Sequence, residues 1–253
     1  MEETESGMSD YKRISNEIKE GLGMQFDPVG VCFSDRIPGD AMHFKKEGRG
    51  CIAPLIFKSA RGRVVAFDRP ATGLPCASFY LGYSEWIFPG IEKFLSNENV
   101  NGREPERFIK NPELAREFIE SFVPEKMRDN VIIFKPLGLF TESEKPELVL
   151  FFVNADQLSA LVFLIGYGAP LEERIVTRFA SACMSMFTLP LKYAEAGEKK
   201  AVWGFHDVSA RKRLPRDLMT LTLTYDLFIE VVEHLGESFI QTETWDYLRK
   251  RNS

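Results

Sequence analysis

The chain has 253 residues, of which 44% are hydrophobic and 27% are charged, a balance typical of a soluble globular protein. This composition excludes an intrinsically disordered chain, a collagen-like repeat and a small disulfide-rich scaffold. The formal net charge of −5 argues against a dedicated nucleic-acid binder, because such proteins usually carry an excess of basic residues.

The first half of the chain mixes predicted helices with predicted strands. Residues 1–10 are rich in acidic side chains and are predicted to form a disordered tail. The elements that follow, within residues 11–135, show apolar residues at helical spacing or short apolar runs between turn residues. They are helices near residues 10–22, 51–60, 85–95 and 112–122, and strands near residues 29–33, 64–67 and 131–134.

Residues 136–253 form the second predicted half. Residues 148–153 are all apolar, which suggests a strand covered on both faces. Asn154 is a good N-cap for the helix that follows it. The remaining elements are helices near residues 155–167, 171–193, 226–235 and 238–248, and strands near residues 201–205 and 218–224. The helix near 171–193 is either continuous or broken, before Cys183 or at Pro190. Helices and short strands alternate, so the fold class is α/β or α+β, with two mixed halves packed as one compact unit.

The two halves share a weak internal pattern. Each has a strand, a cysteine near a helix start, a glycine after that helix and a strand that ends close to an acidic residue. An internal duplication produces such a pattern, and chance can also produce it in a mixed chain. If the halves are duplicated, Cys51 and Cys183 occupy related positions and face each other across a pseudo-two-fold axis.

The sequence predicts a cytoplasmic protein. The N-terminus is acidic and has neither the basic start nor the apolar core of a signal peptide. The longest apolar run, residues 158–167, is too short to cross a bilayer. We therefore expect no membrane partner and no nucleic-acid partner. In a reducing compartment the four cysteines are poor candidates for disulfides, and they are buried thiols, metal or cluster ligands, or reactive groups.

Several short motifs stand out along the chain. They are Pro-Val-Gly-Val at 28–31, Gly-Cys at 50–51, Cys76 followed by Tyr-Leu-Gly-Tyr at 80–83, Val-Asn-Ala-Asp-Gln-Leu at 153–158, and the helix around Cys183. With these motifs the chain resembles an uncharacterised family common in anaerobic prokaryotes, domain of unknown function 169. The resemblance spans most of the chain after the first dozen residues. The family name carries no established activity, so it sharpens the list of candidate residues more than the function.

The resemblance implies cysteines in both halves, and Cys51, Cys76 and Cys183 match such positions. Family members often add a Gly-Cys pair and a following arginine near the end of the second half. Here Gly204 is followed by Phe205, so a ligand is lost or His206 substitutes for it one residue along.

The cysteine spacing allows several kinds of chemistry. There is no C-x₂-C pair, so neither a zinc ribbon nor a ferredoxin pattern is present. A shared site at Cys51, Cys76 and Cys183 would be assembled from three distant segments, and its soft thiolates would suit an iron–sulfur cluster or zinc. Buried free cysteines are the simpler alternative. Cys32 alternates with apolar residues in a strand and is predicted to lie in the core.

A ligand pocket is predicted beside these cysteines. Tyr80, Tyr83 and Trp203 could line it, although core packing is the commoner role of such residues. In the basic segment 209–216, we expect Arg211 to reach the cleft between the halves and bind an anion, with its neighbours in solvent. A solvated charged loop is the alternative.

The leading functional prediction is an iron–sulfur cluster held between the two halves for electron transfer or small-molecule redox chemistry. The alternatives are a non-enzymatic module that binds a small anionic ligand, and a structural zinc site. The partner would be a redox partner or a small anion. The sequence assigns no catalytic residue, substrate or oligomeric state.

Overall fold

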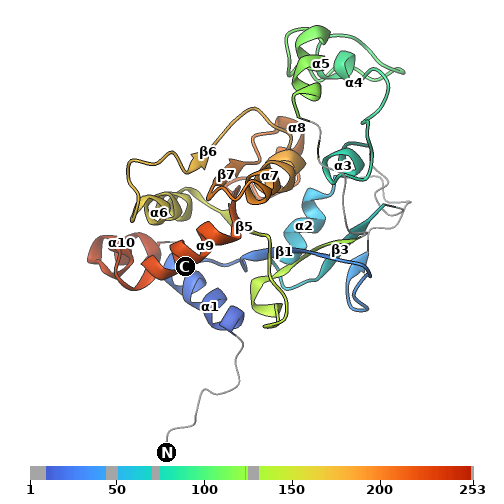
Figure 1. The fold of residues 1–253 in the computed structure, drawn as a ribbon. Coiled ribbons are helices and arrows are strands. Elements are labelled where there is room, and N and C mark those ends of the chain that lie inside the picture. Colours follow the sequence, from blue (N-terminus) through green and yellow to red (C-terminus); the bar gives the residue numbers. More distant parts are fainter. Residues whose placement is uncertain (1–9, 44–50, 70–74, 123, 125–130, 252–253) are drawn as a thin grey trace, which may run out of the picture.

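A computed structural model describes residues 10–43, 51–69, 75–122, 124 and 131–251 (Figure 1). Its framework is one mixed sheet in the order β2-β3-β4-β1-β5-β8-β7-β6. Neighbouring strands are antiparallel, except that the edge strands β2 and β6 run parallel to β3 and β7. The strands are β1 Val29–Ser34, β2 Met42–His43, β3 Val65–Asp68, β4 Val131–Pro136, β5 Leu148–Val153, β6 Ile175–Val176, β7 Ala201–Gly204 and β8 Met219–Thr224.

The strand order repeats outward from the centre of the sheet. From the centre, the first half runs β1, β4, β3, β2 and the second half runs β5, β8, β7, β6. Where β1 meets β5, Val29 pairs with Leu150 and Val31 pairs with Leu148. A two-fold rotation about the centre of this pair therefore places each strand on the other. The strands β3 and β7, which the sequence pattern related, therefore occupy equivalent places. This order is consistent with the predicted pseudo-two-fold arrangement, and duplication itself stays a prediction.

Helices cover both faces of the sheet, because alternate strand residues are buried on opposite sides. The first face carries α2, α3, η2 and α7, and the second carries α1, α6, α9 and α10. The bounds are α1 Asp10–Leu22, α2 Ala53–Ser59, α3 Pro75–Tyr80, α6 Ala155–Gly166, η2 Met184–Thr188 (a π-helical turn), α7 Leu189–Glu195, α9 Tyr225–Glu233 and α10 Glu243–Lys250. The predicted α/β class is thereby confirmed.

A lobe formed by α4 Ile91–Leu95 and α5 Pro112–Glu120 stands away from the sheet (Figure 1). It belongs to the connection between β3 and β4, residues 69–130, whereas β7 and β8 are joined by residues 205–218 only. The corresponding short connection carries α8 Val208–Arg211. The lobe therefore breaks the symmetry of the two halves.

Three predicted helices begin later than expected. The helix expected from residue 85 begins at Ile91, because Pro89 and a left-handed Gly90 occupy the preceding turn. In the segment expected to be helical from residue 171, the edge strand β6 comes first and η2 begins at Met184, which agrees with the break expected near Cys183. The last of the three helices, expected from residue 238, begins at Glu243, after a 3₁₀ turn at residues 239–241. Short 3₁₀ turns complete the fold at η1 Leu137–Leu139, η3 His234–Gly236 and η4 Phe239–Gln241. Within the described residues, no helix is both long and apolar enough to span a membrane.

Candidate functional site

A cavity of about 630 Å³ lies on the first face of the sheet and takes lining residues from both halves of the chain. Its size is in the usual range of small-molecule sites. One part of its wall carries three thiols, and the lobe supplies apolar side chains to another part. The lining also includes polar and charged residues: Tyr80, Arg103, Glu106, Ser181, His206, Asp207, Ser209, Lys212 and Arg213.

The three thiols come from three separate segments. Cys51 directly precedes the residues that start α2, Cys76 lies in the first turn of α3, and Cys183 is the N-cap residue of η2. All three line the cavity, and all are free thiols. Cys183 is buried, Cys51 is half-buried and Cys76 is exposed. The structure thus brings together the three cysteines that the sequence analysis had grouped.

Cys32 lies apart from them. It occupies β1 and belongs to the apolar core on the second face of the sheet, whereas Cys183 belongs to the core on the first face. Burial raises the pKa of Cys32 to about 11, and the nearby Lys135 ammonium acts in the opposite direction. The prediction that Cys32 is a core residue agrees with this position.

Loss of water raises the pKa of each cavity thiol. Burial is the largest cause for all three: it raises the pKa of Cys51, brings that of Cys76 to about 11 and raises that of Cys183 well above its ordinary value. Cys76 has a solvent-accessible surface because it lines the open cavity. Its pKa is nevertheless raised, because the cavity walls displace bulk water from around its sulfur. The thiols are therefore protonated at neutral pH unless a cation stabilises their charge.

The thiols also act on one another. A charge on Cys51 raises the pKa of Cys76, and charges on both raise the pKa of Cys183, in each case after the effect of burial. Backbone N–H groups of Ala53 and Ala77 oppose these effects at Cys51 and Cys76, because they donate to the sulfurs. The three sulfurs are thus electrostatically coupled, as groups around one site should be.

Asp207 is the carboxylate that faces these thiols. It contributes to the raised pKa of Cys51, of Cys76 and of Cys183, after burial in each case. Its Oδ1 accepts hydrogen bonds from the Ser209 N–H at 3.0 Å and the Ser209 hydroxyl at 2.7 Å, which fixes it as the N-cap of α8. Oδ2 accepts from the Ala182 N–H at 3.3 Å.

The strand order relates Asp207 to Cys76. Cys76 lies at the start of α3, the first helix after β3, and Asp207 caps α8, the first helix after β7. The sequence pattern indicated His206 as the candidate and gave the adjacent Asp207 no site role of its own. His206 lines the same cavity, but its Nε2 lies 3.0 Å from the Thr177 hydroxyl and its ring packs against Trp203. The sequence feature that could have indicated Asp207 is an aspartate just after a strand and two residues before a serine, a pattern typical of a helix N-cap.

Of the predicted aromatic pocket residues, only Tyr80 lines the cavity. Burial raises its pKa to about 12, and a hydrogen bond with Ser181 opposes that shift. Tyr83 is a core residue whose hydroxyl donates to the Phe67 carbonyl at 2.8 Å. Trp203 packs with the core of the opposite face, because the side chains of β7 alternate.

In the basic segment, Arg211 does not reach the cavity, contrary to the expectation. The Arg211 guanidinium donates to the carbonyls of Leu218 at 2.5 Å and Arg216 at 2.6 Å, and Arg211 is not among the described residues that line the cavity. Lys212 and Arg213 are exposed, as expected, and they also line the cavity. The prediction assumed an extended chain, in which successive side chains point to opposite sides. Residues 208–211 instead form the helix α8, in which side chains follow the helical period.

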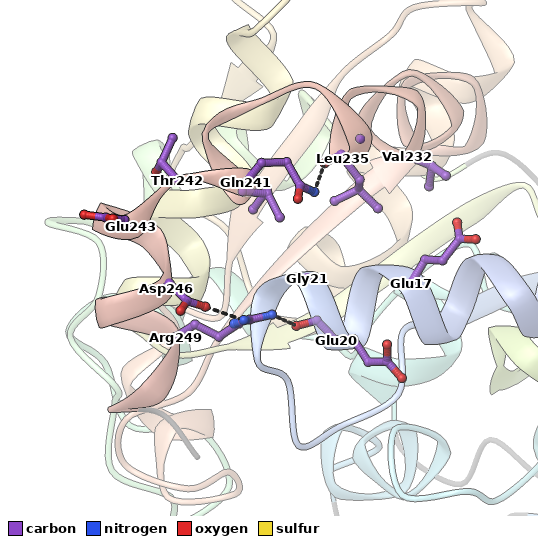
Figure 2. A pocket seen from close by; sticks show the side chains of 12 residues that line it. Glu17, Glu20, Gly21, Val232, Leu235, Gln241, Thr242, Glu243, Asp246 and Arg249 are labelled. Atoms are coloured by element: carbon purple, nitrogen blue, oxygen red, sulfur yellow. Dashed lines mark hydrogen bonds and ion pairs between the residues drawn. The ribbon is translucent and has the colours of Figure 1, made fainter.

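Another hollow, of about 640 Å³, lies between α1 and the C-terminal helices (Figure 2). Its charged lining is mostly acidic, with Glu17, Glu20, Glu243 and Asp246. Figure 2 shows Arg249 bound to Asp246 on its own helix and to the backbone carbonyl of Glu20 in α1, so the walls of the hollow already satisfy this cation. It has no thiol in its lining, and the cavity of the three cysteines remains the candidate site.

Cys76 is expected to react slowly with iodoacetamide despite its exposure. With a pKa of about 11, its thiolate fraction at pH 8 is roughly a hundredfold below that of a thiol with pKa 9, and the rate should rise about tenfold per pH unit up to pH 10. Asp207→Asn keeps the capping oxygen and removes a charge that raises this pKa, so it should accelerate the reaction.

Peptide mass spectrometry of timed samples measures the rate at Cys76 from pH 7 to 10. Asp217→Asn, an exposed change in the same chain region that removes the same charge away from the cavity lining, is the control. Equal acceleration by the two variants would show that Asp207 does not act on the thiols specifically.

A family model matches residues 17–234 of the chain, and its description is an uncharacterised ArCR family, DUF169. The match covers both halves of the sheet and all four cysteines. Neither the curated proteins nor the solved structures gave a match. The chain belongs to the uncharacterised family of domain of unknown function 169.

Proposed function

We propose that this protein holds an iron–sulfur cluster at Cys51, Cys76 and Cys183, and that the cluster serves electron transfer or small-molecule redox chemistry. The observation that carries the proposal is the convergence of three thiols from separate segments on one cavity, while Cys32 lies on the opposite face of the sheet. Thiols that served only as apolar filling would have no reason to share a cavity wall.

The electrostatics of the site support a cationic occupant. Without a cation, burial and mutual repulsion hold all three cysteines in the thiol form. Iron ligation needs thiolates, so binding would release protons, and the positive iron would offset the charge that the cavity disfavours. Arg213 already lowers the pKa of Cys51 in this way.

The proposed occupant is a cluster rather than a single metal ion. In the part of the chain that the structure describes, no group of three His, Cys, Asp or Glu side chains is arranged to hold a single metal ion. A cluster does not need such a group, because each thiolate binds a different iron. Three cysteines leave one iron of a four-iron cluster without a thiolate. Asp207 is one candidate for it, because its carboxylate lines the cavity and acts on all three thiols.

The proposed setting is the cytoplasm. Its reducing conditions keep cysteines reduced rather than in disulfides, as cluster assembly requires, and the four cysteines of this chain are all free. A one-electron donor or acceptor protein would then exchange electrons with the cluster.

The test is to purify the protein without oxygen, reconstitute it with ferrous iron and sulfide, and measure iron, sulfide and zinc. We expect a brown protein with iron and sulfide in comparable amounts, and an electron paramagnetic resonance signal after reduction with dithionite. A colourless protein with one bound zinc would favour the structural zinc site. A protein that retains neither metal after reconstitution would contradict both.

A further inference from the structure

We propose that the cavity also binds an aromatic organic anion, with its carboxylate at Arg213 and its ring against the lobe formed by α4 and α5. This ligand is the class of molecule that would meet the cluster, and only that role rests on the proposed function. The binding itself requires only the described side chains of the cavity.

The lobe gives the cavity its apolar part. Phe88, Phe94 and Phe118 come from the 69–130 connection, which has no counterpart of similar length in the second half. Phe88 packs edge-on against Phe94, with ring centroids 6.0 Å apart. The insertion that breaks the symmetry of the fold thus supplies aromatic walls to the side of the cavity away from the sheet.

These rings are incompletely covered by the rest of the protein. Phe88, Phe94 and Phe118 are half-buried, and Phe179, which precedes η2, is 54% exposed. Phe118 and Phe179 meet edge-to-face at 5.0 Å, so a ring from the lobe contacts a ring from the second half at the cavity. Four partly uncovered aromatic rings around one cavity form a surface that a flat apolar ligand would cover.

The charged groups of the cavity favour an anion. The lining holds Arg103, Lys212 and Arg213 as cations, against the carboxylates of Glu106 and Asp207. Asp207 is already bonded to Ser209 and to the Ala182 N–H. Among the described residues, neither Lys212 nor Arg213 forms an ion pair with a carboxylate, and a guanidinium can bind a ligand carboxylate through two hydrogen bonds.

Arg213 also sets the orientation of the ligand. The rings of the lobe form the apolar part of the cavity, and the three thiols line the same cavity as Arg213. A carboxylate bound to Arg213 would share the cavity with the three sulfurs, and the attached ring would extend towards the rings of the lobe. A neutral aromatic molecule would fill the same apolar space without using Arg213.

The test is calorimetric titration of the intact protein with 2-naphthoate, and with neutral 2-naphthylmethanol for comparison. We expect 2-naphthoate to bind more tightly than the alcohol. Arg213→Gln should weaken the binding of 2-naphthoate about tenfold and leave that of the alcohol nearly unchanged. Phe179→Ala should weaken both about fivefold, because the ring contact is shared.

Two variants control for general effects of the substitutions. Arg216→Gln removes an exposed guanidinium of the same segment that is not part of the cavity lining, and Phe163→Ala removes a ring that is 70% exposed on α6. Both should bind 2-naphthoate like the wild type. Absence of 2-naphthoate binding, equal binding of the neutral alcohol, or equal losses in the controls would overturn the proposal.

The same titration separates this inference from the proposed function. Iron-free protein is titrated beside reconstituted protein. If 2-naphthoate binds and no cluster forms, the cluster proposal fails and the ligand site stands. If the cluster forms and 2-naphthoate does not bind, the ligand site fails and the cluster stands.

Discussion

Replacing Cys183 by serine is expected to abolish cluster binding while the protein stays folded. Cys183 is the most buried of the three cavity thiols, and its sulfur is coupled to those of Cys51 and Cys76. A hydroxyl is a much poorer iron ligand than a thiolate, so the iron content after anaerobic reconstitution should fall at least about tenfold. Iron and sulfide assays, together with visible absorbance, measure the loss.

Cys32→Ser is the matched control. Cys32 is 8% exposed and Cys183 is 6% exposed, so both substitutions place a hydroxyl in a buried site, at a cost of about 1–3 kcal/mol. The two residues lie on opposite faces of the sheet, however, and only Cys183 lines the cavity. The control should therefore keep its iron. Equal loss in both variants would mean that lower stability, rather than the lost ligand, explains the result.

The sheet was largely predictable because most of its strands are continuous apolar runs. Residues 148–153 are all apolar, and β5 occupies those positions with every residue buried. The edge strands β2 and β6 were missed, since each has only two residues and shows no alternation. A two-residue strand forms because a neighbouring strand offers it hydrogen bonds, and that neighbour is distant in the sequence.

The candidate site was predictable only in part, because it too depends on residues that are distant in the sequence. The grouping of the cysteines came from the family resemblance, because their separation along the chain carries no metal-site signature. The roles of Arg211 and Arg213 depended on α8, a four-residue helix too short to show a periodic pattern. The rings of the lobe and Phe179 meet only in the folded chain, so their sequence positions gave no sign of a shared cavity.

Gly30→Val is expected to destabilise the fold strongly. Gly30 lies in β1, where it pairs with Lys135 of β4 and Val149 of β5. A Cβ atom at this position would lie 2.3 Å from Cε2 and 2.7 Å from Cζ of Phe140, which is far inside van der Waals contact. The free energy of unfolding should fall by about 3 kcal/mol, as for severe overpacking of a core.

The Phe140 ring has little freedom to move away. It is 1% exposed and packs against Tyr11, with ring centroids 5.7 Å apart. The Lys135 ammonium lies 4.3 Å from its centroid and is bound to Glu144 at 2.6 Å. Relief of the clash would therefore require movement of α1, where Tyr11 lies, or of β1 itself.

Urea unfolding followed by far-ultraviolet circular dichroism measures the change, with Gly39→Val as the control. Gly39 is exposed, and a Cβ added there meets no atom within 4 Å, so that variant should stay within about 0.5 kcal/mol of the wild type. Phe140→Leu combined with Gly30→Ala should recover part of the stability that Gly30→Ala alone loses, because the smaller side chain removes the ring that the new methyl group meets. If the stability losses of Gly30→Ala and Phe140→Leu simply added in the double variant, the contact with Phe140 would not be the cause of the destabilisation at Gly30. Because Phe140 belongs to the core of the second face and the three cavity thiols lie on the first, the folded fraction of each variant should still bind iron.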